Sequence, residues 1–337
     1  MNRKERLELV IFDVYRDGHR RDYMRVLRRI SGGCVVWGRL SFRWPILMAA
    51  RTLVCSTCDD YLFRFFVLAT TRALVGRRTI GLSIRSETIF QKAGISQQVK
   101  RLLFRIMKVL PRVDLITFMP HWVEPRLARY TSNWMYDLQF WDLAWLNPPA
   151  GDSLELMGKT LRRLADGRSI VAAIGHQRQV KGIQYFMSLY EQADIRERFL
   201  FVCIGPNWDV EKASIADFVE AGGMFLDMQL RDSEMVPVYE IADFIWACYR
   251  PDYDQSSGIF GRALQLGRPA IVRADSYLAR LQAGLCKGGY CIPYGAPEQA
   301  ALIMGSSASE RSPPMAVQMD RSASMLHQYL GLPRTSS

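Results

Sequence analysis

Asp254-Gln-Ser-Ser-Gly-Ile-Phe-Gly-Arg-Ala-Leu-Gln-Leu-Gly-Arg-Pro-Ala-Ile-Val272 is the stretch that decides the fold of this 337-residue chain. Residues 254–258 form a small polar loop, and the apolar residues after them recur at helical spacing until Gly267 stops the helix. The apolar run after Pro269 predicts a buried strand. A polar loop that opens a helix leaves backbone N–H groups free at the positive end of the helix dipole, which favours phosphate. An ordinary αβ unit with a solvated turn shows the same pattern.

The same alternation of strand and helix runs through the whole chain. Continuous apolar runs such as Ser169–Ile174 and Phe199–Ile204 are typical of strands that are buried on both faces of a parallel sheet. The chain opens with a strand at Leu7–Asp13 and a helix at Asp22–Ile30, and a second strand follows at Cys34–Trp37. We therefore expect an α/β fold with doubly wound parallel sheets. Among the later elements, helices are expected at Trp44–Val54, Asp59–Val75, Ser96–Leu110 and Leu154–Ala165, and strands at Thr79–Arg85, Asp114–Met119 and Phe244–Cys248.

The length and one linker signal divide the chain in two. A chain of 337 residues suits two domains of ordinary size, and Asn147-Pro-Pro-Ala-Gly151 is the clearest linker. We therefore predict one Rossmann-like domain at residues 1–150 and a second at residues 151–330.

The basic excess of the chain lies entirely in the first half. Residues 1–150 contain 25 Lys and Arg against 12 Asp and Glu, whereas residues 151–337 contain 19 against 21. A basic half-chain favours a polyanionic partner, which can be a nucleic acid, an anionic membrane surface or a phosphorylated substrate. An arginine-rich soluble surface is the plain alternative.

The predicted helix at Ser96–Leu110 is basic and amphipathic. Its expected apolar face consists of Val99, Leu102, Leu103, Ile106 and Leu110, and its expected basic face consists of Lys100, Arg101, Arg105, Lys108 and Arg112. Such a helix is typical of proteins that rest on anionic lipid, and equally of a surface helix that packs on the core.

The cysteines and the hydropathy pattern indicate a cytoplasmic protein. The chain has seven cysteines, an odd number, and Cys203 and Cys248 lie in apolar runs that predict buried strands. Cys55-x-x-Cys58 has no second pair or histidine cluster at zinc spacing, so no metal site is expected. No signal peptide is visible, and no apolar run reaches the roughly 18 residues of a spanning helix. The expected location is the cytoplasm, including peripheral contact with the inner face of the plasma membrane.

Two loops of the first half are candidates for a ligand site. Gly18-His19 follows the first strand, and Ser86-Glu87 follows the strand at Thr79–Arg85. The carboxyl ends of parallel strands are where such sheets bind ligands. A carboxylate there can act as a base or position a hydroxyl, and His19 can lie at the mouth of the site. A solvated loop histidine and a helix-start glutamate are the alternatives.

Four motifs follow one another in the second half. Gly175-x5-Lys181-Gly182 comes after a buried strand, and Phe201–Gly205 is a strand that ends in glycine. A helix that begins near Leu230-Arg-Asp and ends at Ala242-Asp243 comes next, before the opening stretch with its terminal Gly267-x-Pro269. In this order the motifs, which lie within residues 168–304, resemble the donor-binding domain of GT-B glycosyltransferases. The closest resemblance is to the large family 4 group, the glycosyl transferases group 1.

The resemblance implies a role for each matching residue. Lys181 matches the family lysine that holds the donor diphosphate, and Arg178 can replace the family arginine, whose position is His176 here. Asp254 falls on the first glutamate of the family's E-x7-E motif, which meets the sugar. The other implied donor-binding residues are Gly175, Ser256, Ser257 and Gly258.

The second glutamate of that motif, which meets the donor ribose in the family, falls on Arg262. A guanidinium cannot accept hydrogen bonds from ribose hydroxyls. Either Arg262 meets phosphate, or the ribose is held elsewhere.

The resemblance further implies a GT-B fold, with two Rossmann-like domains facing a central cleft. The implied activity is hexosyl transfer from a nucleotide-sugar to a polysaccharide or polyprenyl-diphosphate-linked saccharide acceptor, with retention and without a metal. The nucleotide-sugar is a substrate, so no cofactor is expected, and polysaccharide or exopolysaccharide biosynthesis is the implied setting. An inactive transferase-like binding module is the first alternative. A nucleic-acid-binding protein is the second, but the basic residues are spread over several helices and no known nucleic-acid motif occurs.

Overall fold

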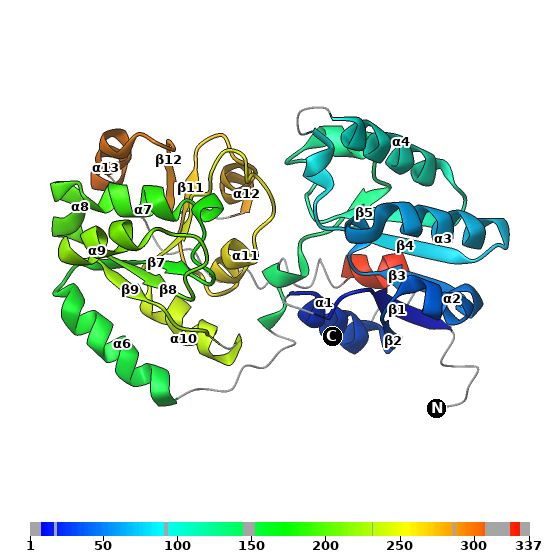
Figure 1. The fold of residues 1–337 in the computed structure, drawn as a ribbon, viewed down its shortest axis with the longest axis horizontal. Helices are drawn as coiled ribbons and strands as arrows, with labels where there is room; N and C mark the ends of the chain where they lie inside the picture. The colour runs from blue at the N-terminus through cyan, green and yellow to red at the C-terminus, as the bar shows by residue number, and fades with distance from the viewer. Residues whose placement is uncertain are drawn as a thin grey trace. The chain divides into compact units, whose positions relative to one another are not determined.

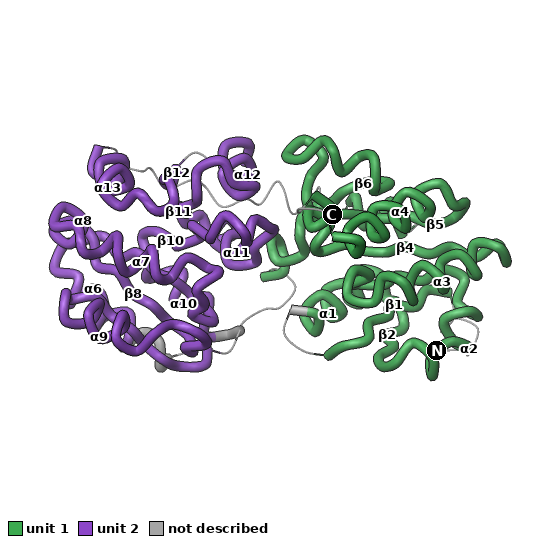
Figure 2. The backbone as a smooth tube through the Cα atoms, turned by 45° about the horizontal axis from the view of Figure 1, so that its top comes forward, with its two compact units in different colours: residues 1–146, 317–337 green, residues 147–316 purple. Residues whose placement is uncertain are grey.

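A computed structural model describes residues 8–16, 19–90, 94–143, 152–230, 232–285, 288–306 and 324–330. The chain divides into two compact units, each with one six-stranded parallel sheet and helices on both faces (Figure 1). Unit 1 contains Met1–Leu146 and Val317–Ser337, and unit 2 contains Asn147–Ala316 (Figure 2). The two sheets confirm the predicted α/β, doubly wound fold class.

The sheet of unit 1 has the strand order β2-β1-β3-β4-β5-β6. Helices α2, α3 and α4 bury apolar side chains against one face of this sheet, and α1 packs against β1. The strands are β1 (Leu9–Asp13), β2 (Cys34–Trp37), β3 (Thr52–Cys55), β4 (Arg78–Ser83), β5 (Val113–Thr117) and β6 (Asn133–Trp134). The helices are α1 (His19–Ser31), α2 (Leu40–Ala49), α3 (Leu62–Leu74) and α4 (Ile95–Val109), and the 3-10 turns are η2 (Cys58–Tyr61), η3 (Ser86–Phe90), η4 (Pro125–Arg129) and η5 (Leu138–Phe140).

The prediction of one helix over Trp44–Val54 is wrong. Helix α2 ends at Ala49, and β3 follows within three residues, paired in parallel with β1 and β4. The buried Arg72 of α3 stabilises this break, because its guanidinium donates hydrogen bonds to the carbonyls of Leu47 and Ala50 at the end of α2. Those carbonyls would otherwise lack partners in the core.

Helix α4 exposes most of its predicted apolar face, of which only Leu103 is buried. Leu103, Phe104 and Met107 face the core. A second set of apolar side chains, spaced four and three residues apart, is exposed instead; it consists of Ile95, Val99, Leu102, Ile106 and Val109. We call this set the α4 stripe.

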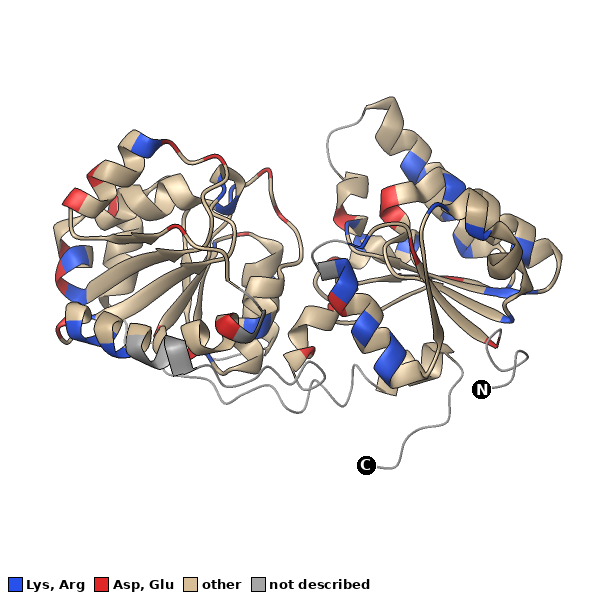
Figure 3. Ribbon diagram, turned by 60° about the horizontal axis from the view of Figure 1, so that its bottom comes forward, with Lys and Arg blue, Asp and Glu red and all other residues tan. Residues whose placement is uncertain are grey.

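Most of the predicted basic side chains of α4 contact other elements of unit 1. Lys100 forms an ion pair with Asp59, Arg101 donates to the carbonyl of Ile89, and Lys108 donates to the carbonyl of Ala128. These contacts draw the long cationic side chains toward the unit and leave the apolar stripe outward. Lys and Arg recur along the other helices of this unit as well (Figure 3).

The chain returns to unit 1 near its end. Residues 324–330 are helical, and Leu326, Tyr329 and Leu330 are buried. The Tyr329 hydroxyl donates a 2.9 Å hydrogen bond to the carbonyl of Trp134. This helix belongs to unit 1 and not to a second domain that runs to residue 330. The predicted linker at 147–151 lies outside the described residues.

The sheet of unit 2 has the strand order β12-β11-β10-β7-β8-β9. Helices α7, α8, α9 and α13 cover one face, and α6, α10 and α11 cover the other (Figure 1). The strands are β7 (Ser169–Ile174), β8 (Phe199–Ile204), β9 (Met224–Leu226), β10 (Phe244–Ala247), β11 (Ala270–Arg273) and β12 (Tyr290–Ile292). The helices are α6 (Asp152–Ala165), α7 (Ile183–Tyr190), α8 (Ala193–Arg198), α9 (Lys212–Glu220), α10 (Asp232–Ile241), α11 (Gly258–Gln265), α12 (Tyr277–Leu285) and α13 (Pro297–Ser306), and the turn η6 (Gln179–Lys181) precedes α7.

Two glycines allow the loops at the carboxyl end of this sheet to pack closely. A Cβ on Gly182, whose φ is +71°, would lie 2.2 Å from the carbonyl oxygen of Cys248. A Cβ on Gly205 would lie 2.1 Å from the carbonyl oxygen of Gly175. Only glycine permits both contacts without a shift of the backbone. The loops after β7, β8 and β10 are therefore held together at one edge of the sheet.

In the described part of the chain, no helix has the length and apolar character needed to cross a membrane.

Candidate functional site

Lys181 places its ammonium group at the carboxyl end of β7. Its Nζ atom and the Cδ1 atom of Ile259 each lie 3.7 Å from the point where a Cβ on Gly175 would be. The loop after β7 thus brings the ammonium group to Gly175, beside the first turn of α11. Two of the four motifs seen in the sequence therefore meet in space.

The charge of Lys181 has no protein counterion. Among the residues that the structure describes, no carboxylate pairs with it and no acceptor takes its hydrogens. Burial lowers the pKa of Lys181 to about 8, and the nearby positive charge of Arg178 adds to this effect. A lysine in this state is stabilised by an anion that binds next to it.

Arg178 is a second cation in the same loop. Its Nε atom is buried and has no hydrogen-bond partner, and its guanidinium carbon lies 5.8 Å from the ring centroid of Trp208. Within the described residues it forms no ion pair. Two uncompensated cations in one loop of eight residues form a site for an anion with more than one charge.

Gln177 fixes the shape of this loop. Its side-chain amide donates to the carbonyls of Ala173 (3.0 Å) and Gly175 (2.7 Å). Its backbone N–H donates to the carbonyl of Pro206, which ties the loop after β7 to the loop after β8. The sequence reading did not single out Gln177, because its importance comes from contacts that only the fold creates.

The first turn of α11 completes the anion site. Ser257 caps the helix, with its hydroxyl accepting from the N–H of Phe260 at 3.3 Å and lying 2.8 Å from the hydroxyl of Tyr249. The N–H groups of Gly258 and Ile259 have no acceptor among the described residues. Ser256 lies one residue before the cap. The cap therefore orients the helix, and its free N–H groups can receive phosphate oxygens.

Asp254 supports the same loop from the other side. Its Oδ1 atom accepts from the N–H of Tyr277 at 3.0 Å and lies 3.2 Å from the guanidinium of Arg273. Burial raises the pKa of this carboxyl, against the opposing effects of that N–H and of Arg273. No contact of Oδ2 with a described residue is found, so one carboxylate oxygen is available for a ligand.

Arg262 lies in the interior of α11 and is buried. Its Nη1 atom lies 3.5 Å from the sulfur of Met235 on α10. The side chain thus extends toward a neighbouring helix.

His176 and Trp208 form the outer rim of the loop. His176 is exposed, and its ring meets that of Trp208 edge-on with 5.4 Å between centroids. Burial lowers the pKa of His176, and the charges of Lys181 and Arg178 lower it further. Trp208 itself is 67% exposed. An exposed tryptophan beside two cations is a feature that sequence spacing did not reveal.

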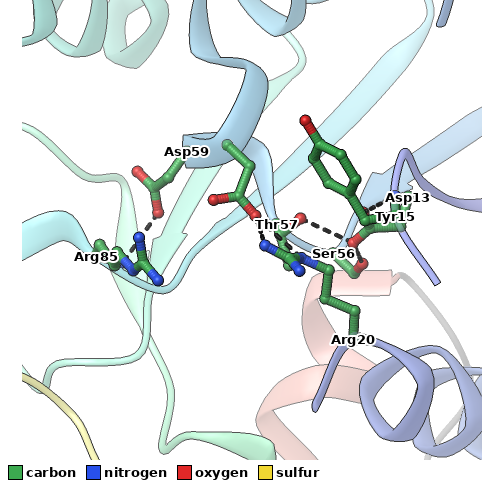
Figure 4. A network of polar contacts seen from close by, with 8 residues as sticks. Asp13, Tyr15, Arg20, Ser56, Thr57, Asp59 and Arg85 are labelled. Carbon is green, nitrogen blue, oxygen red and sulfur yellow. Dashed lines mark hydrogen bonds and ion pairs between the residues drawn. The ribbon is translucent and has the colours of Figure 1, made fainter. Parts of the chain in front are cut away.

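Unit 1 carries a separate polar network at the carboxyl ends of β1 and β3 (Figure 4). Asp13, at the end of β1, is fully buried and accepts hydrogen bonds from the hydroxyls of Ser56 and Thr57 and from the N–H of Tyr15. Burial raises the pKa of Asp13, although these hydrogen bonds oppose the shift. The network fixes the loops after β1 and β3.

A second part of the network joins η2 to its surroundings. Arg20 of α1 donates to Asp60 at 2.6 Å, and Asp59 accepts from the N–H of Arg85 at 3.0 Å (Figure 4). Asp59 also accepts from the hydroxyl of Ser83 at 3.0 Å. These residues were not predicted, although Asp13 could have been suspected because an aspartate ends a buried strand.

Glu87 lies beside this network, in η3. It is buried, and neither carboxylate oxygen has a hydrogen-bond partner among the described residues. Burial raises its pKa to about 8, so the carboxyl carries a proton at neutral pH. The other predicted ligand-site residue of unit 1, His19, begins α1; its side chain lies outside the described part of the structure, as does Gly18.

Comparisons with known proteins identify the fold. No protein-family model matches the sequence, and no curated protein is similar to it in sequence. Anabaena HepE in complex with UDP-glucose has a TM-score of 0.60 at 10% identity, over 96% of this chain and 98% of that one. Thermosynechococcus elongatus sucrose-phosphate synthase has a TM-score of 0.57 at 12% identity, over 88% of each chain. WaaG, a glycosyltransferase involved in lipopolysaccharide biosynthesis, has a TM-score of 0.55 at 12% identity, over 96% and 95%. These likenesses confirm the GT-B type of the fold.

Proposed function

We propose that the protein is a glycosyltransferase that takes its sugar from a nucleotide-sugar. The observation that carries this proposal is the anion site of unit 2. Lys181 lies there beside the first turn of α11, and Arg178 is a second cation in the same loop. Neither side chain forms an ion pair with a described residue. A nucleoside diphosphate carries negative charge, which can pair with these cations, and oxygen atoms, which can accept hydrogen bonds from the N–H groups of that first turn.

The similar structures support the same ligand class. HepE binds UDP-glucose, and WaaG is a glycosyltransferase. One fold can host several activities, so the similar structures support only the class of ligand. The proposal of sugar transfer depends on Lys181, Arg178 and the first turn of α11. The motif order further supports placement near family 4.

The site suits departure of a nucleoside diphosphate. As the bond between the sugar C1 and the phosphate oxygen breaks, its electron pair stays on that oxygen, and Lys181 and Arg178 stabilise the added negative charge. The acceptor hydroxyl forms the new bond to C1 and loses its proton to a base. These cations can neutralise the leaving diphosphate as a divalent metal would, so we propose metal-independent transfer. The resemblance to family 4 is the reason that we propose retention. The second oxygen of Asp254 would bind a sugar hydroxyl.

The acceptor is proposed to bind unit 1. Its basic charge suits a saccharide carried on a polyprenyl diphosphate, as in polysaccharide assembly. His19 remains the predicted contact at the start of α1. Glu87 is buried and its pKa is raised to about 8, so we propose that it does not accept the proton at neutral pH.

The α4 stripe is proposed to contact the anionic surface of a membrane. Its five exposed apolar side chains can insert among lipid acyl chains, and Arg105, which is exposed on the same helix, can approach lipid phosphates. This contact would bring a lipid-linked acceptor to the protein.

The proposed activity is tested with a panel of UDP-, GDP- and ADP-sugars and a lipid extract as the source of acceptor. We expect nucleotide release that depends on the extract, and a loss of at least about tenfold in Lys181→Ala, because a charge-assisted contact to the leaving group is removed. The matched control is Lys212→Ala, which removes an exposed lysine at the start of α9 and should leave release unchanged. Binding of a donor without release would favour the inactive module instead. Release that is equal in both variants would contradict the proposed site.

A further inference from the structure

Unit 1 contains a pocket of about 800 Å³ that the anion site of unit 2 does not include. It lies between the loop after β1, the first turn of α2 and the first turns of α3, and α2 and α3 pack against each other. Its volume is within the range of about 300–1,000 Å³ that is usual for small-molecule sites. The pocket is therefore large enough for a ligand of substantial size.

The walls of this pocket are mainly apolar and aromatic. Tyr15, Trp44, Phe63 and Val67 all line it. Phe63 is 67% exposed and Val67 is 40% exposed, so the apolar wall continues onto the surface of α3. Phe42, which is 77% exposed on α2, extends the same kind of surface beyond the pocket. Apolar side chains that stay in water in this way favour a ligand with a hydrocarbon part.

The charges in the lining are all positive. Arg39 and Arg64 line the pocket, and no carboxylate does. Neither guanidinium has an ion-pair partner or a hydrogen-bond acceptor among the residues that the structure describes. Arg39 also precedes α2, a ten-residue helix whose first turn has no side-chain cap, and Leu40 and Ser41 of that turn belong to the lining. A phosphate or diphosphate group would find two cations and the positive end of a helix dipole here.

We propose that this pocket binds the prenyl diphosphate part of a lipid-linked substrate, with the diphosphate at Arg39 and Arg64 and the first isoprene units along Phe63 and Val67. A ligand with only one of these parts would leave either the cations or the apolar wall unmatched. The inference rests on the proposed function for the identity of the lipid as the acceptor, but the binding itself needs no donor.

The test uses farnesyl diphosphate as a soluble probe and isothermal titration of the full chain. We expect farnesyl diphosphate to bind at least about tenfold more tightly than pyrophosphate or farnesol, and Arg39→Gln with Arg64→Gln to weaken it by at least about tenfold. Val67→Asp, which places a negative charge in an exposed part of the wall, should weaken binding to a similar degree. Arg29→Gln, which removes an exposed arginine of α1 outside the lining, is the matched control and should bind as the unchanged protein does.

Binding of UDP to the same variants separates this inference from the proposed function. Arg39→Gln, Arg64→Gln should retain UDP binding, which also shows that the chain is folded, whereas Lys181→Ala should lose UDP and retain farnesyl diphosphate. Affinity for farnesyl diphosphate that equals that for pyrophosphate, or that survives the double arginine substitution, would overturn the inference. A second result would also overturn the inference. If no farnesyl diphosphate binds, but the double arginine variant no longer floats with phosphatidylglycerol vesicles, then the arginines bind phospholipid head groups.

Discussion

At the scale of single residues, Lys181 connects the sequence motif most directly with chemistry. Its lowered pKa of about 8 means that the uncharged form becomes common just above neutral pH. A bound diphosphate would favour the charged form, so under the proposed function we expect donor affinity to depend on the protonation of Lys181.

We expect the affinity for a nucleoside diphosphate to fall as pH rises through 8, because Lys181 loses its proton there. The fall should level off, since Arg178 stays charged. Lys181→Arg keeps a charge throughout and should show no fall between pH 7 and 9.5. Titration calorimetry across this range measures both profiles, and a fall of equal size in Lys181→Arg would assign the pH dependence to another group.

Glu87 predicts a different dependence on pH, in stability. Its folded pKa of about 8 lies above the ordinary value of 4.5, so the folded protein holds a proton that the unfolded chain releases between these values. Stability should therefore fall as pH rises from about 4.5 to 8, by an amount on the order of a few kcal/mol for a fully buried carboxyl.

Glu87→Gln removes this titration and should flatten that part of the profile. Urea unfolding at pH 5, 6, 7 and 8 measures the slope, and the exposed Glu191→Gln serves as the control with an unchanged slope. Identical slopes for the unchanged protein and Glu87→Gln would show that Glu87 is ionised in the folded state.

The residues of the candidate site could be predicted only in part. Gly175, Lys181 and the loop before α11 follow from motif spacing, because the backbone there must meet a ligand closely. The residues that contact these loops and hold them in shape could not be predicted from motif spacing. Gln177 belongs to the site because it donates a hydrogen bond to the carbonyl of Gly175, and Trp208 because its ring contacts that of His176. The capping role of Ser257 depends on Tyr249, eight residues earlier.

At the scale of the elements, the loop between η6 and α7 shows how close packing shapes the site. Gly182→Ala should destabilise unit 2 by more than about 2 kcal/mol, because its Cβ would lie 2.2 Å from the carbonyl oxygen of Cys248. Gly167→Ala is the matched control, since Gly167 also has a positive φ (+82°) but nothing lies within 4 Å of its Cβ position. That control should cost about 1 kcal/mol in urea unfolding. Equal losses in the two variants would mean that the β10 loop moves away freely.

Helix α4 gives the second prediction at this scale. Val99→Glu with Leu102→Glu should abolish flotation with anionic vesicles, because the two substitutions charge the middle of the α4 stripe. Leu302→Glu alters an equally exposed apolar residue on α13 of unit 2 and should float normally. Flotation of the stripe variant at the level of the unchanged protein would assign membrane contact to another surface.

Most elements could be predicted because their strands are continuous apolar runs that only a parallel sheet buries on both faces. The break after Ala49 could not, because only Arg51 and Thr52 separate the apolar residues of α2 from those of β3. It is stabilised by Arg72, a residue more than 20 positions away, whose guanidinium donates to the backbone carbonyls of Leu47 and Ala50. The sequence predicted Val99, Leu102 and Ile106 of the α4 stripe as apolar, but the helical period alone could not decide whether they face lipid or the core.

At the scale of the whole molecule, each of the two units has its own parallel sheet and its own candidate ligand site. Unit 2 provides the anion site with its unpaired cations, and unit 1 provides the basic surface, the polar network at Asp13 and the pocket with Arg39 and Arg64. Strand and helix alternation predicted both sheets. The return of residues 324–330 to unit 1 was not predictable, because the apolar pattern of that short helix does not specify which core it joins.

Calorimetric titration of UDP, GDP and ADP into the full chain and into Lys181→Ala and Lys212→Ala tests the central claim most directly. We predict that at pH 7 at least one nucleoside diphosphate binds the unchanged protein and Lys212→Ala equally well, and binds Lys181→Ala about 10- to 100-fold more weakly, which is the loss expected for one charge-assisted contact. Absence of binding by every nucleoside diphosphate, or equal binding by Lys181→Ala, would contradict the account.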